Sequence, residues 1–236
     1  MIFAAIMAGG TGSRMKISDK PKQFLEIGGK PIVIHTLEKF MSVDEIDEIY
    51  IGVHPEWTEY MRDLIRNYVE SGQEKLHVVP GGTDRNLTLM NVIDQIEGDS
   101  GESEEHFILT HDAVRPFVTE HIIVENIKTV RRYDACGTAI AAIDTIVASF
   151  DGKVINEVPE RKMMYQQQTP QSFRMSLLRK LFCALSEEEK EQLTDACKIF
   201  VISGVPVRIV EGDVKNMKIT TPGDYQTAEK YMESGG

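Results

Sequence analysis

The sequence predicts an α/β protein with a doubly wound, mostly parallel, Rossmann-like sheet and a protruding β-arm. An apolar run at residues 2–8 passes directly into a glycine-rich segment at residues 9–12, as a buried strand followed by a ligand-binding turn does. Short apolar runs then alternate with helical patterns, which is typical of a parallel sheet covered on both faces. The alternation stops at residues 144–168, where Asp151-Gly152 predicts a hairpin turn.

Each expected element has a local signal. The expected strands are short apolar runs at residues 2–8, 49–53, 76–79, 107–110, 137–143 and 207–210. The expected helices follow proline, threonine or capping signals and cover residues 31–41, 55–69, 84–96 and 119–132, with two more beginning at Ser186 and Pro222. Residues 98–105 read as a polar loop. We therefore expect one domain over residues 1–236, with residues 144–168 forming a β-arm whose strands are 145–150 and 154–158.

Composition narrows the class of protein. The chain has 236 residues, 42% hydrophobic and 27% charged, which suits a globular domain that needs no disulfide or metal to hold its core. Its net charge of −11 disfavours DNA or RNA as a partner, because phosphate neutralisation needs a basic face. Three cysteines without CxxC spacing favour a reducing compartment. No apolar run is long enough to span a membrane, so we expect a cytoplasmic protein without membrane contact.

The glycine-rich segment after the first strand indicates a site for a phosphate chain. Glycines let backbone N–H groups approach phosphates closely, and Arg14 and Lys22 place two cations on one loop. The segment is not a P-loop, because no Gly-Lys-Ser/Thr follows, and it is not a dinucleotide loop, because Met15 stands where the third glycine should be. A triphosphate whose charge must be neutralised is the ligand this pattern favours.

The same residues resemble the sugar-phosphate cytidylyltransferases, a group that includes the methylerythritol-phosphate and ribitol-5-phosphate enzymes. The resemblance extends along the whole chain. Its blocks, in order, are residues 8–14 (AGGTGSR) with 21–25 (PKQFL), 81–85 (GGTDR), 111–116 (HDAVRP), Arg161 with 168–171 (QTPQ), and 218–220 (KIT). Separated blocks in a fixed order are far more specific than a lone glycine motif. The resemblance implies a nucleotidyltransferase fold and a homodimer whose arms exchange between the subunits.

The resemblance also implies roles for individual residues. Arg14 and Lys22 would stabilise the transition state, Arg161 and Lys218 would position the substrate phosphate, and Asp112 would hold Mg²⁺. CTP would be held, largely through backbone contacts, by Ala8, Gly9, Gly10, Gly82, Thr83, Asp84, Arg85, Asn86, Leu87 and Thr88.

Elementary chemistry agrees with these roles. Attack by a phosphate oxygen on the α-phosphorus of CTP brings two polyanions together, so catalysis depends on positioning and on charge stabilisation. The nucleophile is already ionised at pH 7, which fits a sequence without an evident nucleophile–base pair. Asp112 follows a strand at the edge where open α/β sheets bind ligands, and one carboxylate there suits a Mg²⁺ that keeps most of its waters. We expect His111 to brace this turn rather than to act as a base.

The acceptor is less closely defined than CTP. The segments at residues 165–173 and 194–198 resemble the ribitol enzymes, while Glu160 and Lys215 stand where methylerythritol enzymes tend to carry an aspartate and an acid. We therefore expect D-ribitol 5-phosphate as the acceptor, with CDP-ribitol feeding a wall teichoic acid or capsule polymer. 2-C-methyl-D-erythritol 4-phosphate is the alternative. Two rival classes stay open: an NAD-type oxidoreductase and a non-catalytic nucleotide-binding protein.

Overall fold

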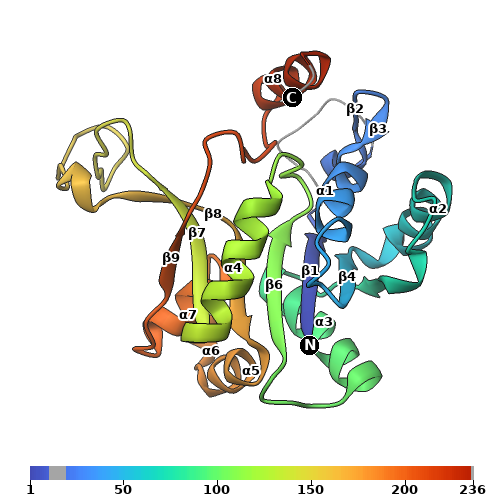
Figure 1. The fold of residues 1–236 in the computed structure, drawn as a ribbon. Helices are drawn as coiled ribbons and strands as arrows, with labels where there is room; N and C mark the ends of the chain where they lie inside the picture. The colour runs from blue at the N-terminus through green and yellow to red at the C-terminus, as the bar shows by residue number, and fades with distance from the viewer. Residues whose placement is uncertain (11–19, 235–236) are drawn as a thin grey trace.

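The computed structural model describes residues 1–10 and 20–234 and has a mostly parallel, seven-stranded sheet at its centre (Figure 1). The strand order is β5–β4–β1–β6–β8–β7–β9. The strands are β1 Ile2–Ala8, β4 Glu48–Val53, β5 Leu76–Pro80, β6 Phe107–Asp112, β7 Ala135–Ala141, β8 Tyr165–Arg174 and β9 Arg208–Glu211. Strands β5, β4, β1 and β6 run parallel, whereas β8 lies antiparallel to both β6 and β7. The expected fold class is confirmed.

Helices cover both faces of this sheet, and a smaller layer lies above its upper edge (Figure 1). One face carries α1 Ile32–Met41, α2 Thr58–Tyr68 and α4 Glu120–Tyr133, and the other carries α3 Arg85–Ser100, α5 Met175–Ala184 and α7 Ala196–Ile202. The remaining elements are α6 Glu187–Glu191, α8 Pro222–Glu233, the hairpin β2 Glu26–Ile27 with β3 Lys30–Pro31, and the 3-10 turns η1 Lys22–Phe24, η2 Pro55–Trp57, η3 Gln73–Lys75 and η4 Arg161–Met163. No helix in residues 1–10 and 20–234 is long and apolar enough to cross a membrane.

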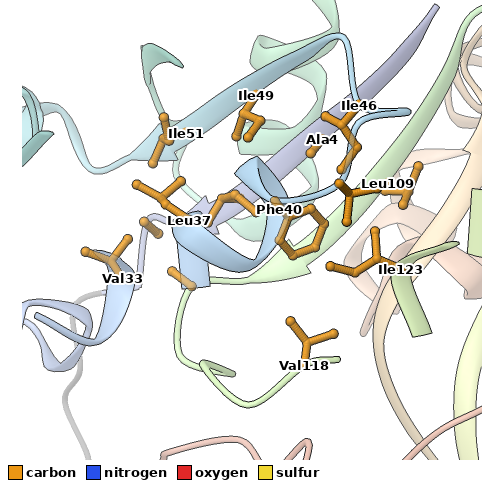
Figure 2. Packing of buried hydrophobic residues seen from close by; sticks show 14 of the residues in the cluster. Ala4, Val33, Leu37, Phe40, Ile46, Ile49, Ile51, Leu109, Val118 and Ile123 are labelled. Carbon is orange, nitrogen blue, oxygen red and sulfur yellow. The ribbon is translucent and has the colours of Figure 1, made fainter. Parts of the chain in front are cut away.

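The core divides into two layers because successive strand residues point to opposite faces. In β1, Ala4 belongs to the layer beneath α1 and α4, whereas Phe3 belongs to the layer beneath α3. Figure 2 shows the first layer, where Leu37 and Phe40 of α1 pack over β4 and β6. These two layers hold the parallel strands in place, so their carboxyl ends lie together at one edge of the sheet, where a site can form.

The predicted helix starts are largely correct. Thr119 caps α4, and Ser186 forms a capping box at the start of α6. Pro222 opens α8 directly after its capping residue, Thr221. Pro31 and Pro55 differ slightly from expectation: Pro31 precedes α1, and Pro55 begins the short turn η2 before α2. Helix α3 continues to Ser100, through residues that were expected to be a loop, and ends before Gly101, whose φ of 76° does not suit a helix.

Strand β8 is the main element that the sequence pattern missed. Its first residues fall within the segment expected to be the arm, and its inner part is rich in polar residues. Those polar side chains are buried because they find partners inside the protein: Ser172 Oγ donates to Asn126 Oδ1 at 3.0 Å, and Thr169 Oγ1 lies 3.0 Å from His111 Nδ1. A strand stabilised in this way lacks the apolar alternation on which the prediction depended.

The segment between β7 and β8 extends away from the sheet at the upper left of Figure 1. The expected paired strands at residues 145–150 and 154–158 are not regular strands here, and one isolated bridge joins Ala148 to Glu157. Asp151 still makes the turn, since its carboxylate accepts from the backbone N–H groups of Lys153 and Val154 at 2.8 and 2.9 Å. Exposed apolar side chains are frequent along this segment: Ile143, Val147, Phe150, Val154, Ile155, Val158 and Met163.

Candidate active site

A cavity of about 620 Å³ opens at the carboxyl ends of the parallel strands β1, β4, β5 and β6. This is the edge at which open α/β sheets bind ligands. The predicted site residues that line it are Ala8, Gly9, Gly10, Lys22, Gly82, Thr83, Asp84, Arg85, Thr88, Asp112 and Lys218. The fold thus brings together residues from the first strand to the loop that precedes the last helix.

Other predicted site residues lie elsewhere. Asn86 is buried at the start of α3 and Leu87 is exposed there, and neither lines the cavity. Arg161 lies in η4 on the arm, where its guanidinium donates to the backbone oxygen of Ile143 at 3.2 Å. It does not line the cavity formed by its own chain. Arg14 lies outside the described residues.

Glycines and one threonine give the cavity wall its shape. The Thr88 hydroxyl accepts from Gly82 N–H at 3.0 Å and donates to the Asp84 oxygen at 2.7 Å, which folds the β5–α3 connection around this side chain. A Cβ on Gly52 or Gly81 would come within 2.6 or 2.9 Å of Thr88, so these positions have no room for a larger residue. A Cβ on Gly10 would meet no atom of the described part of the chain within 4 Å. The open side of the glycine segment therefore offers space for a ligand rather than for the protein itself.

Asp112 is the centre of a charge cluster at the floor of the cavity. Its carboxylate accepts from Arg85 Nη1 at 2.7 Å and from Arg115 Nε at 3.3 Å, and Lys218 Nζ lies 3.0 Å away. Burial alone would raise the pKa of this carboxyl, but Arg85, Lys218 and Arg115 together hold it well below its usual range. One negative and three positive charges leave this group with a net charge of +2, which suits a polyanionic ligand.

Asp112 is also the residue expected from the sequence to hold Mg²⁺. Among the described residues, no group of three or more His, Cys, Asp and Glu side chains gathers as a metal site. Asp112 supplies one carboxylate at the cavity floor, and Mg²⁺ is commonly held by one or two carboxylates together with substrate phosphates and water. One carboxylate at the cavity floor is compatible with a Mg²⁺ that arrives with a nucleotide, provided that the metal takes the place of one of the cations now paired with Asp112.

His111 braces this floor from behind, as expected. Its ring is fully buried, with Nε2 lying 3.1 Å from the Arg115 oxygen and Nδ1 lying 3.0 Å from Thr169 Oγ1. Thr169 Oγ1 also accepts from the Asp112 backbone N–H at 3.1 Å. The histidine therefore acts as a rigid neutral spacer between β6, the following turn and β8.

The burial of His111 predicts a loss of stability in acid. Burial lowers its pKa from 6.5 to about 3, so below pH 6.5 the unfolded chain binds a proton that the folded chain does not. This contribution to stability is complete above pH 6.5 and is lost as the pH falls towards 3, at up to about 1.4 kcal/mol per pH unit. When the free energy of unfolding is measured by urea denaturation at each pH, it is expected to fall less steeply with falling pH in His111→Asn than in wild type. His121→Asn, which removes an exposed histidine of α4, should keep the wild-type slope; equal slopes in all three proteins would contradict the prediction.

Two side chains of this site were quoted in the sequence motifs without receiving a role. Arg115 lies within the HDAVRP block, and its guanidinium joins Asp112 to the backbone oxygen of Asn216 at 2.7 Å. Gln23 lies within the PKQFL block and contacts the glycine segment. Asn216 had no signal at all: it is completely buried and donates to the Gln168 side chain and to the Thr169 backbone oxygen. These contacts join segments far apart in sequence, which periodicity and motif spacing cannot reveal.

Comparison with known proteins identifies this arrangement. The family model described as IspD, 2-C-methyl-D-erythritol 4-phosphate cytidylyltransferase, matches residues 2–234. The structure is similar to that of 4-diphosphocytidyl-2C-methyl-D-erythritol synthase from Anaerococcus prevotii, with a TM-score of 0.81 and 29% identity over 99% of this chain and 96% of that one. It is also similar to 2-C-methyl-D-erythritol 4-phosphate cytidylyltransferase from Francisella tularensis, with a TM-score of 0.79 and 26% identity over 97% and 98% of the two chains.

A third similar structure, the cytidylyltransferase of the same name from Thermus thermophilus, has a TM-score of 0.74 and 23% identity over 99% of this chain and 100% of that one, and supports the fold alone. The family match covers almost the whole chain and agrees with the fold and with the cavity at the strand ends. The chain therefore belongs to the IspD family and is a cytidylyltransferase, a type of nucleotidyltransferase.

Proposed function

We propose that this cytidylyltransferase transfers CMP from CTP to D-ribitol 5-phosphate, forming CDP-ribitol and pyrophosphate. The observation that carries the proposal is the gathering of Lys22, Arg85 and Lys218 around one cavity of a protein with a net charge of −11. Such a cavity suits two phosphate compounds that must approach each other. The product would serve as a precursor of a wall teichoic acid or capsule polymer.

The proposed reaction needs positioning and charge rather than acid–base chemistry. An oxygen of the acceptor phosphate attacks the α-phosphorus of CTP, a new P–O bond forms, and the bond to the β-phosphate oxygen breaks as pyrophosphate leaves. Lys22, together with Arg14, would stabilise the charge that builds up on the transferred phosphoryl group, and Lys218 would hold the acceptor phosphate. Mg²⁺ held at Asp112 would neutralise phosphate charge when it is bound with CTP. Gly82 and Asp84 line the same cavity, and the base and ribose would bind beside them.

Two of the sequence features that favour ribitol meet in the loop that carries Lys218. Gln168 donates to the Asp213 backbone oxygen at 2.8 Å and accepts from Asn216 Nδ2 at 3.2 Å, so the glutamine-rich segment holds the loop that contains Lys215. A lysine in place of an acid raises the positive potential beside Lys218. The segment at residues 194–198 lies away from the Lys218 loop. It leads into α7, and none of its residues lines the cavity.

2-C-methyl-D-erythritol 4-phosphate is the second candidate acceptor, and the comparisons favour it over ribitol 5-phosphate. The matching family model and the similar solved structures carry methylerythritol names. The first two structures described above are 26–29% identical to this chain, so their names do not fix its acceptor. The ribitol proposal depends on the residues of this chain, chiefly Lys215 and the 165–173 segment. Family membership argues against both rival classes, the oxidoreductase and the non-catalytic nucleotide-binding protein.

A homodimer with exchanged arms is part of the same proposal. The arm carries a row of exposed apolar side chains, among them Phe150, which is 87% exposed. Apolar surface of this extent on a projecting segment favours contact with another protein surface. Arg161 lies on that arm and outside its own cavity, so a second subunit would bring Arg161 to the acceptor phosphate in the partner's cavity.

A pyrophosphate-release assay tests the acceptor. With CTP and Mg²⁺, we expect kcat/KM for D-ribitol 5-phosphate to exceed that for 2-C-methyl-D-erythritol 4-phosphate by about tenfold or more, the range over which small substituents are discriminated. Reactions without acceptor, and with ATP in place of CTP, provide the controls. A preference for methylerythritol phosphate would make the second candidate correct. Release with neither acceptor would remove both proposals.

A further inference from the structure

The side-chain amide of Gln23 joins the glycine segment to the turn that carries Lys22. Gln23 lies in η1 and is only 2% exposed. Its Nε2 donates to the Ala8 backbone oxygen at 2.7 Å and to the Gly10 backbone oxygen at 3.0 Å. One amide nitrogen therefore uses both of its hydrogens on the backbone that leaves β1, at the wall of the cavity.

These two bonds fix the direction of backbone donors as well as acceptors. A peptide unit is planar and trans, so its C=O and the N–H of the next residue point in opposite directions. Because the Ala8 oxygen turns towards Gln23, the Gly9 N–H turns away from it. Gly9 and Gly10 both line the cavity, and a Cβ added to Gly10 would meet no atom of residues 1–10 and 20–234 within 4 Å. The amide thus sets the orientation of a backbone donor beside the space available to a ligand.

The turn that carries Gln23 is itself firmly held. Phe24, the next residue, packs its ring against Trp57 and Tyr60, with centroid separations of 5.3 and 5.1 Å. The backbone N–H of Phe24 donates to the Pro21 oxygen at 2.9 Å, which closes the turn. Lys22 and Gln23 are neighbours in this turn, so the cation and the amide that holds the glycine segment share one rigid support.

We propose that Gln23 is a positioning residue that orients the Gly9 backbone N–H towards the phosphate chain of CTP and keeps the segment at residues 8–10 in register with Lys22. The proposal depends on CTP binding in this cavity with its phosphates at residues 8–10. Gln23 also lines the cavity, but both hydrogens of its side-chain nitrogen are used on the Ala8 and Gly10 oxygens, so in this proposal it acts through Gly9 and through the turn. Its contribution is therefore specific to the phosphates, and contacts with base and ribose do not depend on it.

The test compares two ligands that differ only in the phosphate chain. Titration calorimetry with CTP and Mg²⁺, and competition by cytidine, give two dissociation constants for wild type and for Gln23→Met, which keeps the side-chain volume and removes both donors. We expect the preference for CTP over cytidine to fall about tenfold in the variant, as for buried carbonyls left without their donor. An unchanged preference would overturn the proposal, whatever happens to each constant alone.

Control variants distinguish the loss of a positioning contact from a general loss of structure. Asn126→Ala removes another buried amide, whose Nδ2 donates to the Ile122 oxygen and to Thr138 Oγ1, both at 2.9 Å and outside the cavity; this variant should keep the wild-type preference. If Gln23→Met does not fold, Gln23→Ser, which admits water to the two carbonyls, takes its place under the same criterion. Failure of wild type to bind CTP would instead refute the proposed function, so the two failures are distinguishable.

Discussion

Replacing Asp112 with asparagine is expected to reduce turnover by about 10²–10³-fold, the loss seen when one preorganised charge-stabilising group is removed from an active site. The carboxylate holds Arg85, Arg115 and Lys218 at 2.7–3.3 Å, and an uncharged amide would leave these cations to repel one another. The Mg²⁺ requirement should rise as well, because the protein ligand proposed for the metal would be lost. Steady-state kinetics at varied Mg²⁺ concentration measure both effects.

The same substitution is expected to lower the free energy of unfolding by about 3 kcal/mol, the low end of the range for breaking a buried ion pair. The low end applies because Lys218 and Arg85 can turn partly towards water, their side chains being 41% and 29% exposed. CTP should restore more stability to the variant than to wild type, since its phosphates replace the missing negative charge. Urea denaturation with and without CTP measures this difference.

Asp94→Asn is a suitable control for the Asp112 variant. Asp94 accepts from Arg179 at 2.7 Å on α3, away from the cavity, and loss of this exposed pair should leave turnover unchanged. Asp112→Asn with wild-type turnover and an unaltered Mg²⁺ requirement would show that this carboxylate serves only the fold.

Replacing Lys22 with alanine is expected to reduce kcat by about 10²–10³-fold while changing the KM for CTP much less. Lys22 lines the cavity on the rigid turn η1, beside the segment where we place the phosphates. A cation that acts mainly on charge developing in the transition state affects turnover more than ground-state binding. Steady-state kinetics at saturating acceptor separate the two parameters.

Lys22→Arg should recover part of the activity, because it restores the charge with a different geometry. Lys30→Ala provides the control, since Lys30 pairs with Glu38 at 2.6 Å and lies outside this cavity. Turnover close to wild type in Lys22→Ala would remove Lys22 from the chemistry.

The parts of the fold that the sequence predicted are those governed by local chemistry. The glycine segment after β1, the proline that begins α8 and the capping residues Thr119 and Ser186 each act within a few residues, and each was located from the sequence. Strand β8 was missed because its stability comes from partners on other strands and helices, such as Asn126 for Ser172. A polar strand buried by tertiary hydrogen bonds has no apolar period to detect.

The same contrast between local signals and contacts of distant segments holds for the residues of the site. Asp112, Lys22 and Lys218 were identified by charge, by strand-end position and by motif, and the fold brings them to one cavity. What the sequence did not reveal is how Asp112 is surrounded: the motif around it suggested a carboxylate available to metal, whereas the structure pairs it with three cations. Asn216, which connects Arg115 to Thr169, is an interior residue of an irregular loop and leaves no local signature.

Because β8 runs from the projecting segment to the centre of the sheet, it connects the exposed segment directly with the side chains that support the cavity. Tyr165 lies at the exposed end, and Gln168 and Thr169 lie near the middle of the strand, beside the Lys218 loop and His111. A slip of one residue along a strand turns every side chain to the opposite face, so Thr169 would leave His111 and Gln168 would release Asp213. A molecule that bound the outer end of β8 and shifted the strand would therefore inhibit the enzyme from outside the nucleotide cavity.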